Sequence, residues 1–296
     1  MPIEVFLEMR ARTSDTQGYL WLTGSLGVQY VNPKTHWVYK VFKENPEEGS
    51  RVFEFPTALN PYFPKDELAR LKETLDPQSY KAMFEINWDT QPQNTIYNSF
   101  SEANVMQNAY RRELPVSVAI DWGFGHPTAA LFMQYDERRD VVYVIDEIYK
   151  ERTLLDDLYQ QILAKKYNIT QWYCDPAGLQ TREQTAMSNV QWFKEKYNVH
   201  FKWRRTNVVP GIALVRSYVM NSNGQRRLYV DEKCKHTIDE FKNYRFKERD
   251  GQTIDEPLKE NDDALDALRY WFVNHIAPRQ KGDNIKTLNA WDIMKW

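Results

Sequence analysis

Four aspartates stand at the ends of regular segments of the sequence and could together bind metal ions. Asp121 ends the apolar run VSVAID, and Asp175 directly follows the run TQWYC. Asp263 and Asp266 lie at the start of the run DDALDALRYWFV, whose apolar residues have helical spacing. Because residues three apart share one face of a helix, the last two carboxylates should point in the same direction.

Such a group of carboxylates suits the hydrolysis of phosphodiester bonds. Like charges raise one another's pKa values and oppose folding unless cations neutralise them. Oxygen-only donor sets are typical of Mg²⁺ or Mn²⁺ sites. Two ions could clamp the attacking and leaving oxygens of a phosphodiester, one by activating a water and the other by stabilising the leaving 3′ oxygen. This chemistry needs no side-chain nucleophile, and no convincing Ser/His or Cys/His arrangement is present in the sequence.

Each carboxylate also has a structural interpretation. An aspartate after a strand commonly holds a turn, and acidic residues at a helix start oppose the helix macrodipole favourably. Asp262 is acidic too, so it is an alternative to Asp263 as a ligand. The joint occurrence of these residues, in the order and at the elements that a two-metal site needs, favours the metal-site interpretation.

Other titratable residues are expected to lie outside this site. We interpret Asp146 and Glu147 as a surface or edge feature, because the far end of their strand should point them away from the other acidic residues. His126 and His275 are predicted to be structural, since no zinc-ligand spacing includes them.

Hydrophobic periodicity from residue 115 onward predicts strands and helices in a definite order. The first three strands are separated by short turns and should form an antiparallel meander. Helices after the third and fourth strands indicate that the sheet continues with parallel strands. The predicted strands are 115–123, 127–136, 140–150, 170–178, 199–204 and 226–230, and the predicted helices are 153–167, 181–197, 210–220, 231–244 and 262–276.

This order predicts an α/β fold with a mixed sheet flanked by helices, as in ribonuclease H-like proteins. If the first and fourth strands are adjacent and parallel, Asp121 and Asp175 emerge side by side at one edge of the sheet. The last helix must then cross the sheet to bring Asp263 and Asp266 to the same place.

The first hundred residues predict a smaller α+β segment. We expect strands at 18–27 and 35–42, and a helix within 60–75 that starts near Pro64. The polar stretch 88–114 suggests a boundary near residue 110. The sequence contains no GxxxxGK[ST] segment, so it has no P-loop of its own.

Bulk composition excludes some classes of protein. The 296 residues have a formal net charge of −2, so any nucleic-acid contact must depend on locally concentrated positive charge. The sequence contains no stretch of 18 uninterrupted apolar residues, so we expect no membrane span. The N-terminus lacks the apolar core of a signal peptide, which favours a cytoplasmic location. The two cysteines, Cys174 and Cys234, are not expected to form a disulfide.

Basic residues cluster at three places and could hold DNA phosphates on one side of the acidic site. A solvated surface is the alternative for each residue alone. Nothing suggests contacts to base edges, so we expect weak sequence preference. The candidates are Lys202, Arg204 and Arg205 around Trp203, then Arg226 and Arg227, and then Lys242, Arg245 and Lys247.

Three segments resemble the nuclease domain of bacteriophage large terminases: VAIDWG with PTAALFM, WYCDPAG, and PLKENDDALDALRY (257–270). The resemblance implies that Asp121 and Asp175 are the first two metal ligands and that Asp263 and Asp266 are the pair from the last helix. Many terminases have a histidine where this chain has Asp263. The DALDAL core is also similar to the last-helix motif of Holliday-junction resolvases, which share the fold.

The first hundred residues extend this resemblance. WLTGSLG is similar to the motif that couples ATP hydrolysis to motion in terminase motors, and 57–88 is similar to the last part of the ATPase domain. We therefore expect a remnant of that domain without Walker A at 1–110, a nuclease domain at 111–277 and a tail at 278–296. No ATPase activity is expected from this chain alone.

The resemblance implies an endonuclease that cuts double-stranded DNA during phage genome packaging, with two Mg²⁺ or Mn²⁺ ions. Its implied partners are DNA, the phage portal and the small terminase subunit, in the host cytoplasm and transiently at the procapsid portal. Two alternatives remain: a resolvase or transposase-like nuclease of the same fold, and a catalytically inert module that docks on the portal. The tail could serve as a docking peptide or be disordered.

Overall fold

The computed structural model describes residues 3–277 except 15, 17, 25, 27–33, 35, 47, 89–94, 124–125, 180–186, 206 and 250–251. The predicted tail at 278–296 lies outside the described residues. A seven-stranded sheet with the order β1-β7-β4-β3-β2-β5-β6 forms the centre of the larger part. Its strands are β1 (Val105–Met106), β2 (Val116–Asp121), β3 (Thr128–Asp136), β4 (Val141–Lys150), β5 (Ile169–Cys174), β6 (Phe201–Lys202) and β7 (Leu228–Asp231).

The strand pairing confirms the predicted fold class. Strands β2, β3 and β4 form the antiparallel meander. Strand β5 is parallel to β2, β6 is parallel to β5, and β7 is parallel to β4. The first and fourth long strands are therefore adjacent and parallel, as expected, and their carboxyl ends lie at the same edge of the sheet.

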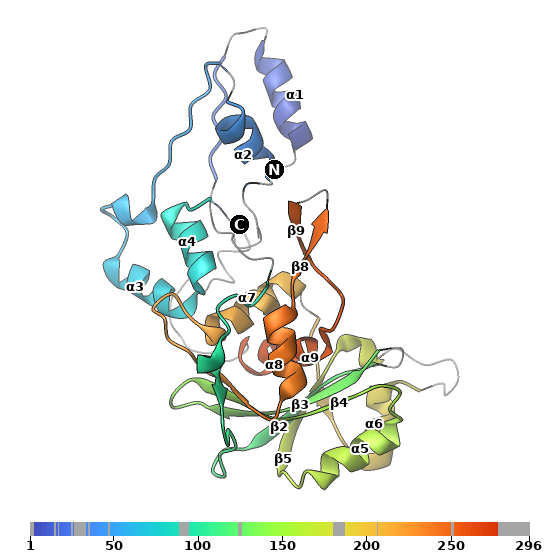
Figure 1. Ribbon diagram of the computed structural model, residues 1–296. Coiled ribbons are helices and arrows are strands. Elements are labelled where there is room, and N and C mark those ends of the chain that lie inside the picture. The colour runs from blue at the N-terminus through green and yellow to red at the C-terminus, as the bar shows by residue number, and fades with distance from the viewer. Residues whose placement is uncertain are drawn as a thin grey trace.

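Helices cover both faces of the sheet (Figure 1). Alternate residues of β2 explain the two layers, because Val118 and Ile120 join one core cluster and Ala119 joins the other. Helix α9 packs on the Ala119 face, where the Trp271 indole N–H donates to Ser117 Oγ at 2.7 Å. The helices are α5 (Leu155–Ala164) and α6 (Asn189–Tyr197) on one face, with α7 (Val208–Val219), α8 (Lys235–Asn243) and α9 (Asp263–His275) on the other.

A hairpin after α8 was not predicted from the sequence. It consists of β8 (Phe246–Arg249) and β9 (Gln252–Pro257), which pair in antiparallel fashion. Figure 1 shows it projecting from the helical layer above the sheet. The short segment after the hairpin leads directly into α9, so the position of the hairpin affects where the last helix begins.

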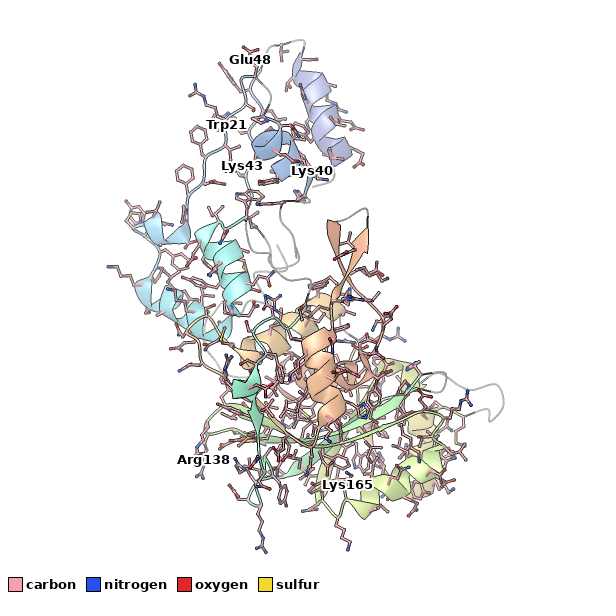
Figure 2. The ribbon with its side chains drawn as sticks, viewed as in Figure 1. Trp21, Lys40, Lys43, Glu48, Arg138 and Lys165 are labelled. Carbon is pink, nitrogen blue, oxygen red and sulfur yellow. The ribbon has the colours of Figure 1, made fainter. Side chains whose placement is uncertain are left out.

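The N-terminal segment is mostly helical, and one prediction there is wrong. The expected strand at 35–42 is instead α2 (Trp37–Tyr39) followed by the π-helical turn Lys40–Glu44. Both Trp37 and Phe42 contact the ring of Phe6 from α1 (Ile3–Ser14). Aromatic packing therefore overrides the alternating pattern. Figure 2 shows Lys40 and Lys43 in this segment, away from Lys165 on the sheet-bearing part.

Other parts of the N-terminal segment also differ from expectation. The expected strand at 18–27 is absent from the described residues 18–24 and 26, and its other residues lie outside them. The expected helix within 60–75 is present as α3 (Lys65–Thr74). Helix α4 (Pro77–Glu85) was missed, although Asp76 caps its start by accepting from the Gln78 and Ser79 N–H groups. Short 3₁₀ turns occupy Thr57–Leu59, Glu102–Asn104 and Pro176–Leu179.

Residues before 110 also contribute to the sheet-bearing part. Ile96 and Tyr97 belong to the core cluster on the α9 face. The Asn104 side-chain amide donates to the carbonyls of Val219 and Leu228, both at 2.9 Å. The predicted domain boundary at 110 stays a prediction.

In the part of the chain that the structure describes, no helix combines the length and apolar character needed to span a bilayer. Cys174 and Cys234 are buried free thiols.

Candidate metal centre

Asp121 forms the centre of the acidic site at the end of β2. Its side chain is only 7% exposed, and its backbone pairs with Ala129 of β3. Burial raises the pKa of Asp121 well above its usual value, and the charges of Asp266, Asp175 and Asp263 raise it further. Asp121 therefore interacts with each of the other three predicted carboxylates, and a fully ionised cluster is unfavourable without a compensating cation.

Asp175 approaches Asp121 from the neighbouring strand. It is the first residue after β5, it is half-buried, and its backbone N–H donates to the Ile120 carbonyl at 3.3 Å. The 3₁₀ turn that follows packs on Trp122, where a Cβ at Gly178 would lie 2.3 Å from the indole Nε1. Only glycine lets this turn sit so closely on the residue that follows Asp121.

The first turn of α9 supplies the other two carboxylates. Asp263 and Asp266 are each 6% exposed, although acidic side chains at a helix start are usually solvated. One donor atom from each of Asp121, His126 and Asp263 lies within 4.8 Å of the others. Asp262 holds the N-cap position, and its Oδ2 faces Lys259 and the Tyr244 hydroxyl instead.

His126 also lies in this cluster, whereas the sequence indicated only a structural role for it. Its Nδ1 lies 2.5 Å from Asp263 Oδ1, and more than half of its side chain is exposed. It stands just before β3. Since β2 and β3 are antiparallel, the residue that precedes β3 lies at the same end of the sheet as Asp121. The antiparallel meander predicted from the sequence therefore already indicated that His126 would lie at the same end of the sheet as Asp121.

Tyr149 was also missed. Ala129 of β3 pairs with Asp121 on one side and with Tyr149 of β4 on the other. The Tyr149 hydroxyl donates to Asp263 Oδ2 at 3.1 Å. Burial and then the charges of Glu240 and Asp263 raise the pKa of Tyr149, so its hydroxyl remains a donor.

Glu240 of α8 supports the start of α9 from the other side. It is 3% exposed and its Oε2 accepts the Leu265 N–H at 2.9 Å. Burial raises the pKa of Glu240 to about 8, against the opposing effect of hydrogen bonds from the Leu265 and Ala264 backbone. Glu240 therefore caps the helix that carries two of the candidate ligands.

Two cations contact Asp266. Lys259 Nζ lies 2.8 Å from Oδ2, and Arg269 Nη2 lies 2.9 Å from Oδ1. Arg269 is 4% exposed and fits against α7 because a Cβ at Gly211 would lie 2.8 Å from its Cγ. Burial opposes the charged form of Lys259, but the charges of Asp266 and Asp262 outweigh it and raise the pKa of Lys259.

The donor set fits a divalent cation. Buried carboxylate oxygens at Asp121 and Asp263, with the imidazole of His126 beside them, lie close enough to share one ion. Carboxylate oxygens suit Mg²⁺ and Mn²⁺, and imidazole is a common ligand of transition ions.

One basic group lies at the same end of the sheet as the acidic site. Lys202 of β6 pairs with Tyr173 of β5, two residues before Asp175. Because β5 and β6 are parallel, Arg204 and Arg205 continue past the edge where Asp121 and Asp175 emerge. All three basic residues are exposed.

The structure does not bring Arg226 and Arg227 to the acidic site. They precede β7, which is parallel to β4 and therefore starts at the opposite end of the sheet. Arg227 pairs with Asp140 and stacks over Tyr218 at 4.2 Å. The Arg226 guanidinium donates to the Ser99 carbonyl at 3.3 Å. Both arginines hold the fold together at this end.

The remaining basic candidates have separate surroundings. Lys242 pairs with Glu102 at 2.8 Å, and Lys247 pairs with Glu256 in the hairpin. Arg245 is exposed and follows Tyr244, whose hydroxyl contacts Asp262. Arg245 is therefore the member of this group for which no ion pair with a described residue is found, and it adjoins a residue that contacts Asp262.

Asp146 and Glu147 are not surface features, which corrects that interpretation. Asp146 is 7% exposed and pairs with Lys165 at 2.7 Å. Glu147 accepts the N–H groups of His236 and Thr237 at 2.9 Å each, and thereby caps α8. His275 has a structural role, as expected. Its Nδ1 lies 2.6 Å from the Tyr173 hydroxyl, and its ring stacks on Trp271.

Comparison with known proteins identifies the family. The family model described as the terminase RNaseH-like domain matches residues 118–275, which is more than half of the chain. The terminase large subunit of Escherichia phage T5 is 25% identical over 159 residues, covering 52% of this chain and 34% of that protein. The chain thus matches about a third of the length of this curated relative.

The structure of the large terminase from a thermophilic bacteriophage is also similar. It has a TM-score of 0.64 and 20% identity to this chain, and the match covers 93% of this chain and 67% of that one. This likeness shows a shared fold.

Proposed function

This chain belongs to the terminase RNaseH-like domain family, and from that membership we propose that its acidic site cuts double-stranded DNA as the nuclease of a phage large terminase during genome packaging. The observation that carries the proposal is the convergence of one donor atom each from Asp121, His126 and Asp263 within 4.8 Å, which brings the first turn of α9 to the neighbouring ends of β2 and β3, far earlier in the sequence. Asp175 and Asp266 add charge to the same site.

The proposed cofactors are two Mg²⁺ or Mn²⁺ ions, held by Asp121, Asp175, Asp263 and Asp266 together with His126. When bound, such ions polarise the phosphodiester and lower the pKa of a water that attacks it. Asp121 is the shared ligand in this proposal, because it interacts with all three other carboxylates. Tyr149 orients Asp263 through its hydrogen bond to Oδ2.

We propose that Lys202, Arg204 and Arg205 hold the phosphates of the DNA backbone beside the site. Their exposure and their position at the carboxyl ends of β5 and β6 support this role. Such contacts to phosphates carry no sequence information, so cutting should show little sequence preference. Arg245 is a second, separate candidate, because it is exposed and follows Tyr244, whose hydroxyl contacts Asp262.

We also propose which activities and partners of a whole large terminase apply to this chain. The sequence has no GxxxxGK[ST] segment, so we propose no ATP hydrolysis by these residues alone. Family membership supports the portal and the small terminase subunit as partners, in the host cytoplasm and at the procapsid portal. The proposed division is an ATPase remnant at 1–110, a nuclease domain at 111–277 and a tail at 278–296.

Plasmid cutting tests the central proposal. Supercoiled plasmid is incubated with the protein and Mg²⁺ or Mn²⁺, and nicked and linear products are measured. We expect Asp121→Ala to lose roughly 100-fold or more of the rate, because a shared ligand is removed. Asp157→Ala is the matched control, since Asp157 is on α5 at the opposite face of the sheet from α9.

The same assay separates the alternatives. Equal cutting by the Asp121→Ala variant and the unchanged protein would refute the assignment of the site. Preferred cutting of a synthetic four-way junction over linear duplex would favour a resolvase. No cutting of either substrate by the unchanged protein with either ion would favour an inert docking module.

A further inference from the structure

Lys259 lies beside two carboxylates at the start of α9, and its ammonium group compensates part of their negative charge. Its Nζ lies 2.8 Å from Asp266 Oδ2 and 3.0 Å from Asp262 Oδ2. It thus bridges two carboxylates at the start of α9. A single ammonium group takes on part of the task that a divalent ion would perform there.

The backbone holds Lys259 in this position from both sides. The neighbouring Leu258 N–H donates to the Arg245 carbonyl at 2.9 Å, which fixes the segment to the start of the hairpin. On the other side, Asn261 has a left-handed conformation with a φ of 50°. Asparagine tolerates this conformation better than most residues. The turn brings the lysine back over the helix that follows it.

The acidic site therefore has two parts with different charge balance. Both oxygens of Asp266 are engaged by cations, Oδ1 by Arg269 and Oδ2 by Lys259. Among the described residues, no lysine or arginine forms an ion pair with Asp121 or Asp263. Their near neighbour is His126, whose Nδ1 faces Asp263. A first divalent ion can bind at Asp121, His126 and Asp263 without displacing a cation, whereas an ion at Asp266 Oδ2 must compete with Lys259.

We propose that Lys259 is a built-in cation that competes with the second divalent ion for Asp266. This inference rests on the proposed two-ion function and adds an order to it. The first ion binds to the Asp121–His126–Asp263 part, and the second binds only when the Lys259 ammonium leaves Asp266. In the metal-free protein, Lys259 keeps the carboxylates at the start of α9 compatible with folding.

Two effects follow from Coulomb's law. A positive charge beside Asp266 weakens the binding of a further cation at the same carboxylate, so removal of that charge should tighten the second ion. Without any cation, the loss of Lys259 leaves Asp262 and Asp266 less compensated, so the metal-free protein should be less stable. A merely structural lysine would produce only the second effect.

Titration calorimetry with Mn²⁺, on the full chain without DNA, measures the first effect. We expect two ions of unequal affinity in the unchanged protein. In Lys259→Met, the second ion should bind about tenfold tighter or more while the first changes little. Lys259→Arg, which keeps the charge, should behave like the unchanged protein. Lys233→Met is the control, because Lys233 lies 3.5 Å from Asp146, a residue outside the acidic site.

Thermal unfolding in EDTA measures the second effect and checks folding. Lys259→Met should melt at a lower temperature than the unchanged protein. Saturating Mn²⁺ should raise the melting temperature of this variant by more than it raises that of the unchanged protein. If Lys259→Met does not fold, Lys259→Gln is used, since glutamine removes the charge but keeps a donor.

The proposal is overturned if removal of the Lys259 charge leaves the affinity of the second ion unchanged, or if Lys259→Arg tightens it as much as Lys259→Met. These results concern metal binding only. Failure of the proposed nuclease function would instead show as equal cutting by the Asp121→Ala variant, so the two failures are distinguishable.

Discussion

The Nδ1 of His126 lies 2.5 Å from Oδ1 of Asp263, a residue 137 positions later in the chain. This contact joins the turn between β2 and β3 to the first turn of α9. It puts an imidazole beside the carboxylates of Asp121 and Asp263, where it can share an ion with them. Each side of the contact can be tested separately.

Replacement of His126 tests whether its imidazole is a ligand. We expect His126→Ala to raise the Mn²⁺ concentration needed for half-maximal plasmid cutting by about tenfold or more, because one donor is lost while the buried carboxylates remain. His200→Ala is the control, since His200 is exposed and contacts only Asn198 among the hydrogen bonds of the described residues. The same metal requirement in both variants would place His126 outside the ligand set.

Asp262 and Asp263 can be distinguished by the same assay. Asp263→Asn should lower the cutting rate by roughly 100-fold or more, because Asp263 lies in the cluster with Asp121. Asp262→Asn should have a much smaller effect, since its carboxylate faces Lys259 and Tyr244. A larger loss in the Asp262 variant would move the ligand assignment by one residue.

Glu240 should make the metal-free protein less stable as pH rises. Its pKa is raised by burial to about 8 in the folded protein, from an ordinary value near 4.5. The folded state therefore holds a proton that the unfolded state releases, and stability falls as pH rises between these two values. Thermal melts in EDTA from pH 5 to 8 should show this decline.

Glu240→Gln should reduce that decline, because the amide is neutral throughout and its oxygen can still accept the Leu265 N–H. The difference in melting temperature at pH 8 should favour the variant by roughly 3 °C, equivalent to about 1 kcal/mol in a domain of the size proposed for the nuclease. Asp121 has a raised pKa as well, so some decline should persist. Parallel pH profiles for the two proteins would contradict this role of Glu240.

The two groups of basic residues should differ in DNA binding. Combined replacement of Lys202, Arg204 and Arg205 by alanine should weaken binding to linear duplex. It should also reduce the slope of log affinity against log salt by about 0.9 for each lost phosphate contact. Filter binding or fluorescence anisotropy at several salt concentrations measures both quantities.

Arg227→Ala should instead reduce stability by about 1–2 kcal/mol, because Arg227 pairs with Asp140 and stacks on Tyr218. The salt dependence of DNA binding by this variant should match that of the unchanged protein. A lower salt slope in this variant would show that DNA reaches the opposite end of the sheet.

The order of the elements and the main carboxylates could be predicted from the sequence. Strands β2 and β5 are short, mostly apolar segments that end at or directly before an aspartate, and α9 has helical spacing, so each is visible in its own local pattern. Asp121, Asp175 and Asp263 mark the ends of these elements, and such positions follow from the local pattern alone. The start of α4 has an equally local signal, because Asp76 is an N-cap residue and Pro77 is the first residue of the helix.

Only the tertiary structure decided which other residues join the site. Tyr149 and Lys259 have ordinary surroundings in the sequence, and they meet the carboxylates through strand register and the turn before α9. The predicted meander already put His126 at the end of the sheet that carries Asp121, but only the packing of α9 brought Asp263 against its imidazole. Arg226 and Arg227 look like a basic patch in the sequence, but the parallel pairing of β7 with β4 puts them at the other end of the sheet. Periodicity reports which face of an element is buried. Which end of one element meets which end of another depends on long-range packing, and that packing brought the charges of this site together.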